Sequence, residues 1–138
     1  MVLKNILIIS SLCVAVHLGS AVHETKEYAL DLPEEIVQAL KAGDAKMVSK
    51  FFNSSIELNF SEIQGVYGKA QAEQILKDFF TKNASANGKF EYNHLHTFNN
   101  KDNAQYYIGE LHTGKGIYRL HIFMKDQRIH QIRIDSND

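Results

Sequence analysis

AQYYIGELHTGKGIYRLHIFMKDQRIHQIRI, residues 104–134, alternates between apolar and polar side chains through three successive segments. Alternation with a period of two is typical of strands that bury one face. The segments are 104–113, 117–125 and 129–134, and the links between them are Gly114-Lys115-Gly116 and Asp126-Gln127-Arg128. Links this short join neighbouring antiparallel strands, so these residues predict a β-meander. A fourth strand pattern, at 90–98, precedes it across a polar turn.

The facing of the strands follows from the same alternation. One strand is predicted to bury Tyr118, Leu120, Ile122 and Met124, and the last strand is predicted to group His130 with Ile132 and Ile134. Three-residue turns would align these faces, with Gly116 in the left-handed conformation. A two-residue Gly114-Lys115 turn would instead place Glu110 opposite Arg119. The register stays open between these alternatives, because a slip of one residue reverses the facing of a whole strand.

The residues before the meander predict three amphipathic helices and a hairpin. Pro33 suits the first turn of a helix that stops at Gly43, and Asp44 can cap a second, short helix. Alternating residues 56–60 and a partner at 63–67 predict the hairpin, and the strongest helical pattern follows Gly68. Helices packed on one face of a curved antiparallel sheet make an α+β cone, whose incompletely closed interior is the expected ligand cavity.

Composition limits the class of protein. The 138 residues are 44% hydrophobic and 22% charged with a formal net charge of −1, as expected for one globular domain. A single Cys excludes a disulfide scaffold. Nucleic-acid binding usually leaves a basic stripe, and the chain has none.

The amino terminus is predicted to be a signal peptide covering residues 1–21. Lys4 precedes an apolar stretch at 6–18, and Gly19-Ser20-Ala21 supplies the small residues of a cleavage site. The stretch is too short to span a bilayer, so no membrane span is expected after cleavage. Cys13 follows Leu12 rather than a small residue, which argues against lipidation. We therefore expect an exported protein, periplasmic, secreted or at the cell surface, with a polar lead-in at 22–31 and a domain at 32–138.

Three segments carry a resemblance to a known family: residues 32–44 (LPEEIVQALKAGD), residues 65–72 (GVYGKAQA) and Ile117-Tyr118-Arg119. Together with the order of predicted elements, they resemble an exported bacterial family of domains of unknown function. That family belongs to the nuclear transport factor 2-like (NTF2-like, cystatin-like roll) superfamily. The resemblance implies the fold over about residues 32–134, but no activity, because this superfamily contains enzymes, binding proteins and scaffolds.

Six side chains are predicted to line the cavity: Tyr67, Tyr92, His94, Tyr106, Tyr118 and His130. Tyrosines with apolar rings and hydroxyl tips suit a partly wet pocket. His94 and His96 lie two apart on a predicted strand, so their imidazoles would share one face about 7 Å apart. No third ligand is fixed near them by the sequence, so neither a metal nor a cofactor is expected.

The function predicted from these residues is a non-enzymatic binding or interaction module that holds a small apolar or amphipathic ligand. An alternative is protein–protein assembly, such as a homodimer, through the open face of the sheet, where Arg119 and His121 are expected. A lyase or isomerase with His94 or His130 as base and a tyrosine as hydrogen-bond donor is a further alternative. It is weakened because the predicted buried faces carry no Asp or Glu.

Overall fold

A computed structural model of the chain describes residues 31–137. The predicted signal peptide, its cleavage site and residues 22–30 of the predicted lead-in lie outside this range. The described elements, in chain order, are α1 (Glu34–Ala42), α2 (Ala45–Ser49), β1 (Phe52–Phe60), β2 (Ile63–Gly68), α3 (Lys69–Asn83), β3 (Glu91–Asn99), β4 (Ala104–Thr113), β5 (Gly116–Lys125) and β6 (Arg128–Ser136). This order is the one that the sequence predicts.

Local chemistry explains where the first two helices begin and end. Glu34 and Glu35 occupy the first turn of α1, where the helix dipole favours negative charge. Gly43 closes α1 with a left-handed φ of 63°, a conformation that glycine adopts without strain. Asp44 then caps α2, because its carboxylate accepts a hydrogen bond of 3.0 Å from the Met47 amide.

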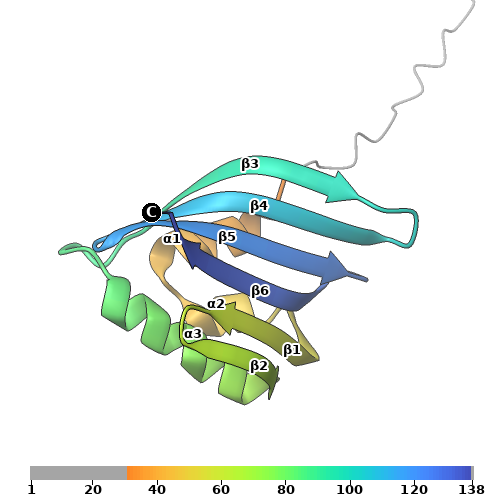
Figure 1. The fold of residues 1–138 in the computed structure, drawn as a ribbon, viewed down its shortest axis with the longest axis horizontal. Helices are drawn as coiled ribbons and strands as arrows, with labels where there is room; N and C mark the ends of the chain where they lie inside the picture. The colour runs from red at the N-terminus through yellow and green to blue at the C-terminus, as the bar shows by residue number, and fades with distance from the viewer. Residues whose placement is uncertain (1–30, 138) are drawn as a thin grey trace, which may run out of the picture.

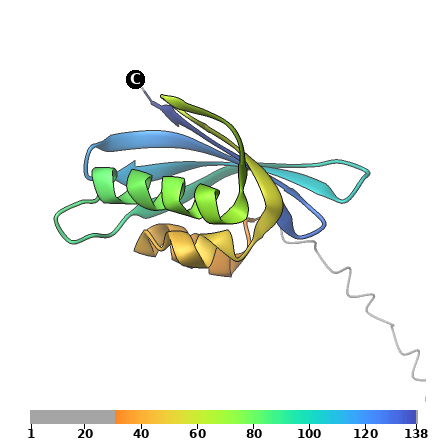
Figure 2. The same ribbon diagram turned by 90° about the horizontal axis from the view of Figure 1, so that it is seen from below.

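The strands form a single six-stranded sheet in the order β2-β1-β6-β5-β4-β3. β3 to β6 are the predicted antiparallel meander, whereas β1 pairs with β6 in parallel, so the sheet is mixed rather than wholly antiparallel. The sheet is strongly curved, and all three helices lie on its concave side (Figures 1 and 2). The α+β roll covered on one face by helices is therefore confirmed.

Apolar side chains fill the space between the helices and the sheet. α1 buries Ile36 and Leu40, and α3 buries Leu76 and Phe80. From the sheet, the fully buried residues include Ile56, Leu58, Leu111, Leu120, Ile122, Ile129 and Ile132. Aromatic rings fill the centre, with Phe80 and Phe90 at 5.1 Å between centroids and Phe79 and Tyr118 at 5.3 Å. The middle of the predicted cone is thus packed with side chains.

Both turns of the meander contain two residues. Thr113 pairs with Gly116 and Glu110 with Arg119, so the Gly114-Lys115 alternative is the one adopted. Lys125 pairs with Arg128, and the intervening Asp126 and Gln127 have φ of 49° and 61°. The three-residue turn predicted at 126–128 is therefore wrong. Two central residues with positive φ give a turn whose twist matches that of the flanking strands.

Two irregularities correct the predicted facing of the histidines. In β6, Gln131 pairs with Phe123 but Ile129 pairs with Met124, so His130 is an extra residue. Ile129 is buried instead of His130, for which the sequence predicts the buried position. In β3, His94 pairs with Gly109 and His96 with Ile108, which leaves Leu95 as the extra residue. A β-bulge shifts the alternation by one. His94 and His96 consequently lie on opposite faces of the sheet rather than on one.

Gly114 allows the β4–β5 turn to approach the end of α3 closely. A Cβ at this position would lie 2.4 Å from the Ala84 carbonyl oxygen and 2.7 Å from the Ser85 Cα, which are both backbone atoms. We predict that Gly114→Ala lowers the free energy of unfolding by about 1 to 3 kcal/mol, because the backbone must move to relieve the overlap. Urea denaturation measures the change, and Lys115→Ala in the same turn is the control. Equal stability of the two variants would contradict this account.

A cavity at the open end of the sheet and an aromatic row on its outer face

The concave side of the sheet carries a cavity of about 490 Å³ beyond the helices. Figure 2 shows the β3–β4 hairpin extending past the helices at this end. The lining residues come from the entry to α1, the residue before β1, the start of β4 and the end of β5 with its turn: Asp31, Pro33, Glu35, Phe51, Gln105, Tyr107, Met124 and Gln127. We call this hollow the open-end cavity.

The open-end cavity has an apolar floor and a polar rim. Met124 and Tyr107 are buried, at 2% and 4% exposure, and Phe51 and Pro33 are half-buried. The carboxylates of Asp31 and Glu35 and the amide of Gln127 belong to exposed residues at the edge. An apolar surface with a few polar groups around it suits a ligand with an apolar body.

A hydrogen-bonded cluster centred on His94 borders the cavity. His94 Nε2 lies 3.0 Å from the Thr97 hydroxyl and 3.7 Å from the Asp31 carboxylate. His94 Nδ1 lies 3.4 Å from the Tyr92 hydroxyl, and the imidazole contacts the Tyr107 ring at 6.4 Å between centroids. The bulge in β3 brings these groups together, because it places both His94 and Thr97 on the concave face.

The tyrosine hydroxyls of this cluster hold their protons strongly. Burial, followed by the negative charge of Asp31 and the Tyr107 hydroxyl, raises the pKa of Tyr92 to about 12. Burial and Asp31 also raise the pKa of Tyr107 above its usual value. Both side chains are therefore neutral phenols at physiological pH, able to donate as well as accept a hydrogen bond.

The structure does not bring the six predicted site residues together. Tyr92 and His94 lie on the concave face beside the open-end cavity. Tyr67 and Tyr118 pack against the core elsewhere, and the Tyr118 hydroxyl donates a hydrogen bond of 2.8 Å to the Asn83 side chain. A smaller hollow of about 200 Å³ lies beside Tyr118. Tyr106 and His130 lie on the outer face and contact Phe123.

Several residues of the cavity were absent from the sequence prediction. Met124 was placed on the buried face of its strand, and the β4–β5 pairing then puts Tyr107 on the same face, opposite Ile122. Once the two-residue turn is assumed, Tyr107 follows from the sequence. Asp31 and Phe51 are not predictable in this way, because only the tertiary packing brings them beside β4.

The outer, convex face of the sheet carries a row of rings that crosses four strands. Phe98 pairs with Tyr106 and Tyr106 with Phe123, and the Phe123 ring lies 6.2 Å from His130 between centroids. Phe98 is 58% exposed. We call Phe98, Tyr106, Phe123 and His130 the aromatic row.

Charged groups of both signs lie beside the aromatic row. Arg119 reaches the Glu110 carboxylate at 3.6 Å, and His121 reaches Asp135 at 3.8 Å, as expected for the outer face. Arg119 Nε and His121 Nδ1 are buried, and neither has a hydrogen-bond partner within residues 31–137. Burial lowers the pKa of His121, as do Arg133 and Arg119, while Asp135 acts in the opposite direction.

The family model of a domain of unknown function, DUF4783, matches residues 33–135. The chain belongs to the DUF4783 family. A DUF4783 protein from Bacteroides ovatus is 29% identical and superposes with a TM-score of 0.68, over 79% of this chain and 98% of that one. A DUF4783 protein from Bacteroides uniformis is 27% identical with a TM-score of 0.68, over 78% and 99%. A search of curated proteins found no match.

More distant structures share the fold of the DUF4783 domain. An NTF2-like protein of unknown function from Cytophaga hutchinsonii is 14% identical with a TM-score of 0.53, over 75% of this chain and 85% of that one. A de novo designed protein with a curved β-sheet is 19% identical with a TM-score of 0.53, over 75% and 80%. These likenesses show the fold alone, and it is the NTF2-like fold that the sequence resemblance implies.

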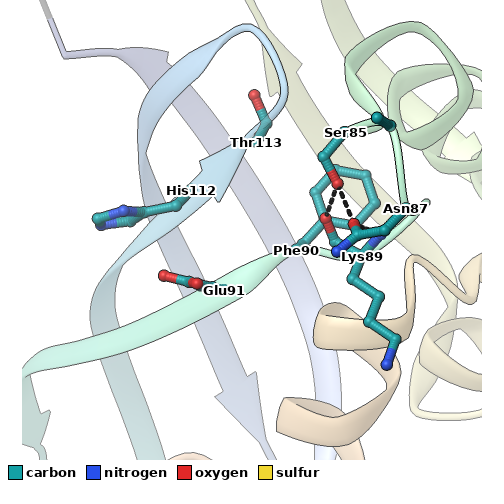
Figure 3. Close-up of a pocket in the computed structure, with 8 residues that line it drawn as sticks. Ser85, Asn87, Lys89, Phe90, Glu91, His112 and Thr113 are labelled. Atoms are coloured by element: carbon teal, nitrogen blue, oxygen red, sulfur yellow. Dashed lines mark hydrogen bonds between the residues drawn. The ribbon is translucent and has the colours of Figure 1, made fainter.

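A third hollow of the DUF4783 domain, of about 430 Å³, lies where the loop after α3 meets the β4–β5 turn. Ser85 donates a hydrogen bond of 2.6 Å to the Lys89 carbonyl oxygen, which shapes the loop. Figure 3 shows that the Lys89 ammonium points away from Glu91 and His112. The charged groups therefore do not converge on one point, and this hollow presents no focused site.

The described part of the DUF4783 domain shows no metal-binding group of three or more His, Cys, Asp or Glu side chains. None of the helices within residues 31–137 is long and apolar enough to cross a membrane.

The raised pKa of Tyr92 predicts how stability depends on pH. A tyrosine of the unfolded chain loses its proton near pH 10, whereas folded Tyr92 keeps it to about pH 12. Between these values the folded state binds more protons, so the free energy of unfolding must fall as pH rises from 10 to 12. Tyr92→Phe should reduce this fall by about 2 kcal/mol at most. Urea denaturation between pH 9 and 12 measures it.

The matched control for this titration is Tyr106→Phe, which removes a hydroxyl from the outer face and leaves the concave tyrosines intact. It should show the same loss of stability with pH as the unmodified protein. Parallel pH profiles for the Tyr92→Phe variant and the unmodified protein would contradict the assignment.

Proposed function

We propose that this DUF4783 domain is an exported, non-enzymatic module that binds a small apolar or amphipathic molecule in the open-end cavity. The observation that carries the proposal is the cavity of about 490 Å³ over the apolar floor of Tyr107 and Met124. Its size falls in the range of small-molecule pockets. The NTF2-like fold of the domain is compatible with ligand binding.

The surroundings of His94 favour binding over catalysis. His94 is the predicted base that lies on the concave face, but both of its nitrogens have neighbours within the His94 cluster, and it does not line the cavity. His130, the other predicted base, is on the outer face beside Phe123. A general base must reach the proton that it removes, and neither histidine is placed at the cavity floor.

Export is proposed from the signal-peptide pattern of residues 1–21 alone. A ligand-binding module outside the cytoplasm is consistent with the lack of cysteine in residues 22–138. Amino-terminal sequencing of the protein isolated from its own host tests this part of the proposal. The first residue is expected to be Val22.

The ligand site predicts binding of the neutral fluorophore N-phenyl-1-naphthylamine, whose emission rises in apolar surroundings. Gln105→Trp should weaken this binding at least about tenfold, because a large ring then occupies space above Tyr107 and Met124. Fluorescence titration of the purified protein measures the dissociation constant.

Tyr106→Trp is the control for the binding experiment, because Tyr106 is the next residue of β4 and faces the opposite side of the sheet. It should bind the fluorophore as the unmodified protein does. Failure of the unmodified protein to bind the fluorophore, or undiminished binding by Gln105→Trp, would contradict a ligand site in the open-end cavity.

A second candidate function is self-assembly through the outer face, and the aromatic row is the observation that favours it. Phe98 is exposed and the other three rings are half-buried, and aromatic rings at the surface are enriched at interfaces with other proteins. Glu110, Arg119 and Asp135 place charges of both signs on the same outer face, farther along the strands, so a second copy of the chain can pair its charges with them across a two-fold axis.

Assembly through the aromatic row predicts a dimer in sedimentation equilibrium at high micromolar concentration. Phe98→Asp should shift the molecules to monomers, because a carboxylate would be buried without a partner in the contact. Val66→Asp is the matched control, since Val66 is 71% exposed on β2, away from the row. A monomer at every concentration, or a dimer disrupted equally by both variants, would rule out this interface.

A further inference from the structure

The charged residues that line the open-end cavity are all negative. Of its eight lining residues, Asp31 and Glu35 carry carboxylates and none carries a positive charge. The two amides, Gln105 and Gln127, are neutral. A ligand that places its polar end at this rim therefore meets two negative charges, while its apolar body lies over the floor.

The Asp31 carboxylate lies 3.7 Å from the His94 imidazole, which borders the cavity without lining it. The lysines and arginines nearest along the chain do not line it either. Lys50, Lys125 and Arg128 are each adjacent in sequence to a lining residue, but none of them lines the cavity. The Arg128 guanidinium is engaged elsewhere, because it donates a hydrogen bond of 2.9 Å to the Lys50 carbonyl oxygen. The negative charge of Asp31 reaches the hydroxyls inside, since it contributes to the raised pKa of both Tyr92 and Tyr107.

The floor adds a second reason to expect a cation. Phe51 and Tyr107 present aromatic rings to the cavity, and the face of such a ring attracts organic cations. An anionic head group would meet two like charges and no cationic partner among the lining residues. A cationic head group meets both carboxylates and the rings together.

We propose that the open-end cavity selects amphipathic molecules with a cationic head, such as an alkylammonium, over anionic molecules with the same apolar body. This inference rests on the proposed ligand site and specifies the chemical class that the site prefers. Asp31 and Glu35 are the residues that determine the selectivity, and Phe51 and Tyr107 supply the surface for the cation and its chain.

The test uses displacement of N-phenyl-1-naphthylamine by three molecules with the same eight-carbon chain: octyltrimethylammonium, octyl sulfate and neutral octyl glucoside. All are used below their micelle-forming concentrations. The cationic compound should displace the fluorophore at a concentration about tenfold lower than the anionic one at low ionic strength, and the ratio should shrink in 0.5 M salt. Fluorescence titration gives the displacement constant of each compound.

The double variant Asp31→Asn/Glu35→Gln should bring the ratio of the displacement constants of the cation and the anion close to one. Glu34→Gln is the control, because Glu34 lies in the same turn of α1 but does not line the cavity. Equal displacement by the anion, or an unchanged ratio in the double variant, overturns the charge selectivity and leaves the ligand site intact. No binding of the fluorophore by the unmodified protein overturns both.

Discussion

The two-residue period of side chains along a strand, and its interruption at two bulges, determines what each face of this sheet presents. The extra residue at Leu95 puts His94 and Thr97 on the concave face and His96 on the convex face. Because His130 is an extra residue in β6, its imidazole lies on the convex face and Ile129 is buried in the core. Without these bulges the concave cluster would lose its link to Thr97 and the aromatic row would lose its last ring. The aromatic row therefore depends on the bulge in β6, and the cluster that borders the cavity depends on the bulge in β3.

The open-end cavity exists because the strands are longer than the helices that cover them. A strand of ten residues such as β4 extends about 33 Å, whereas α1 with nine residues extends about 14 Å and α3 with fifteen about 22 Å. Helices of these lengths cannot cover the whole concave face. The covered part is filled by rings such as Phe79, Phe80 and Phe90. The hollow consequently lies at the uncovered end of the sheet rather than in the middle of the cone, where the sequence placed it.

The fold could be predicted from the sequence because each element has its own local signal, from Pro33 before the first helix to the short links of the meander. The site could be predicted only in part. Tyr92 and His94 lie on the inner face, whereas Tyr106 and His130 lie on the outer face, because a choice of turn length and a single bulge reverse the facing of all the residues that follow. Phe51 and Asp31 reach the cavity through tertiary packing, for which a single sequence carries no local pattern.

The open-end cavity and the aromatic row lie back to back on the same strands. Tyr107 faces the cavity while its neighbour Tyr106 belongs to the aromatic row, and Met124 and Phe123 are divided in the same way. A partner bound to the convex face would therefore touch the strands that form the cavity floor without entering the cavity. Ligand binding and self-assembly are compatible for this reason, and neither excludes the other on steric grounds.

The designed protein with a curved sheet supports a related point: this curvature can be built without any evolved function, so the fold itself does not identify the ligand. The class of ligand or partner must therefore be inferred from the side chains at the rim of the cavity and on the convex face.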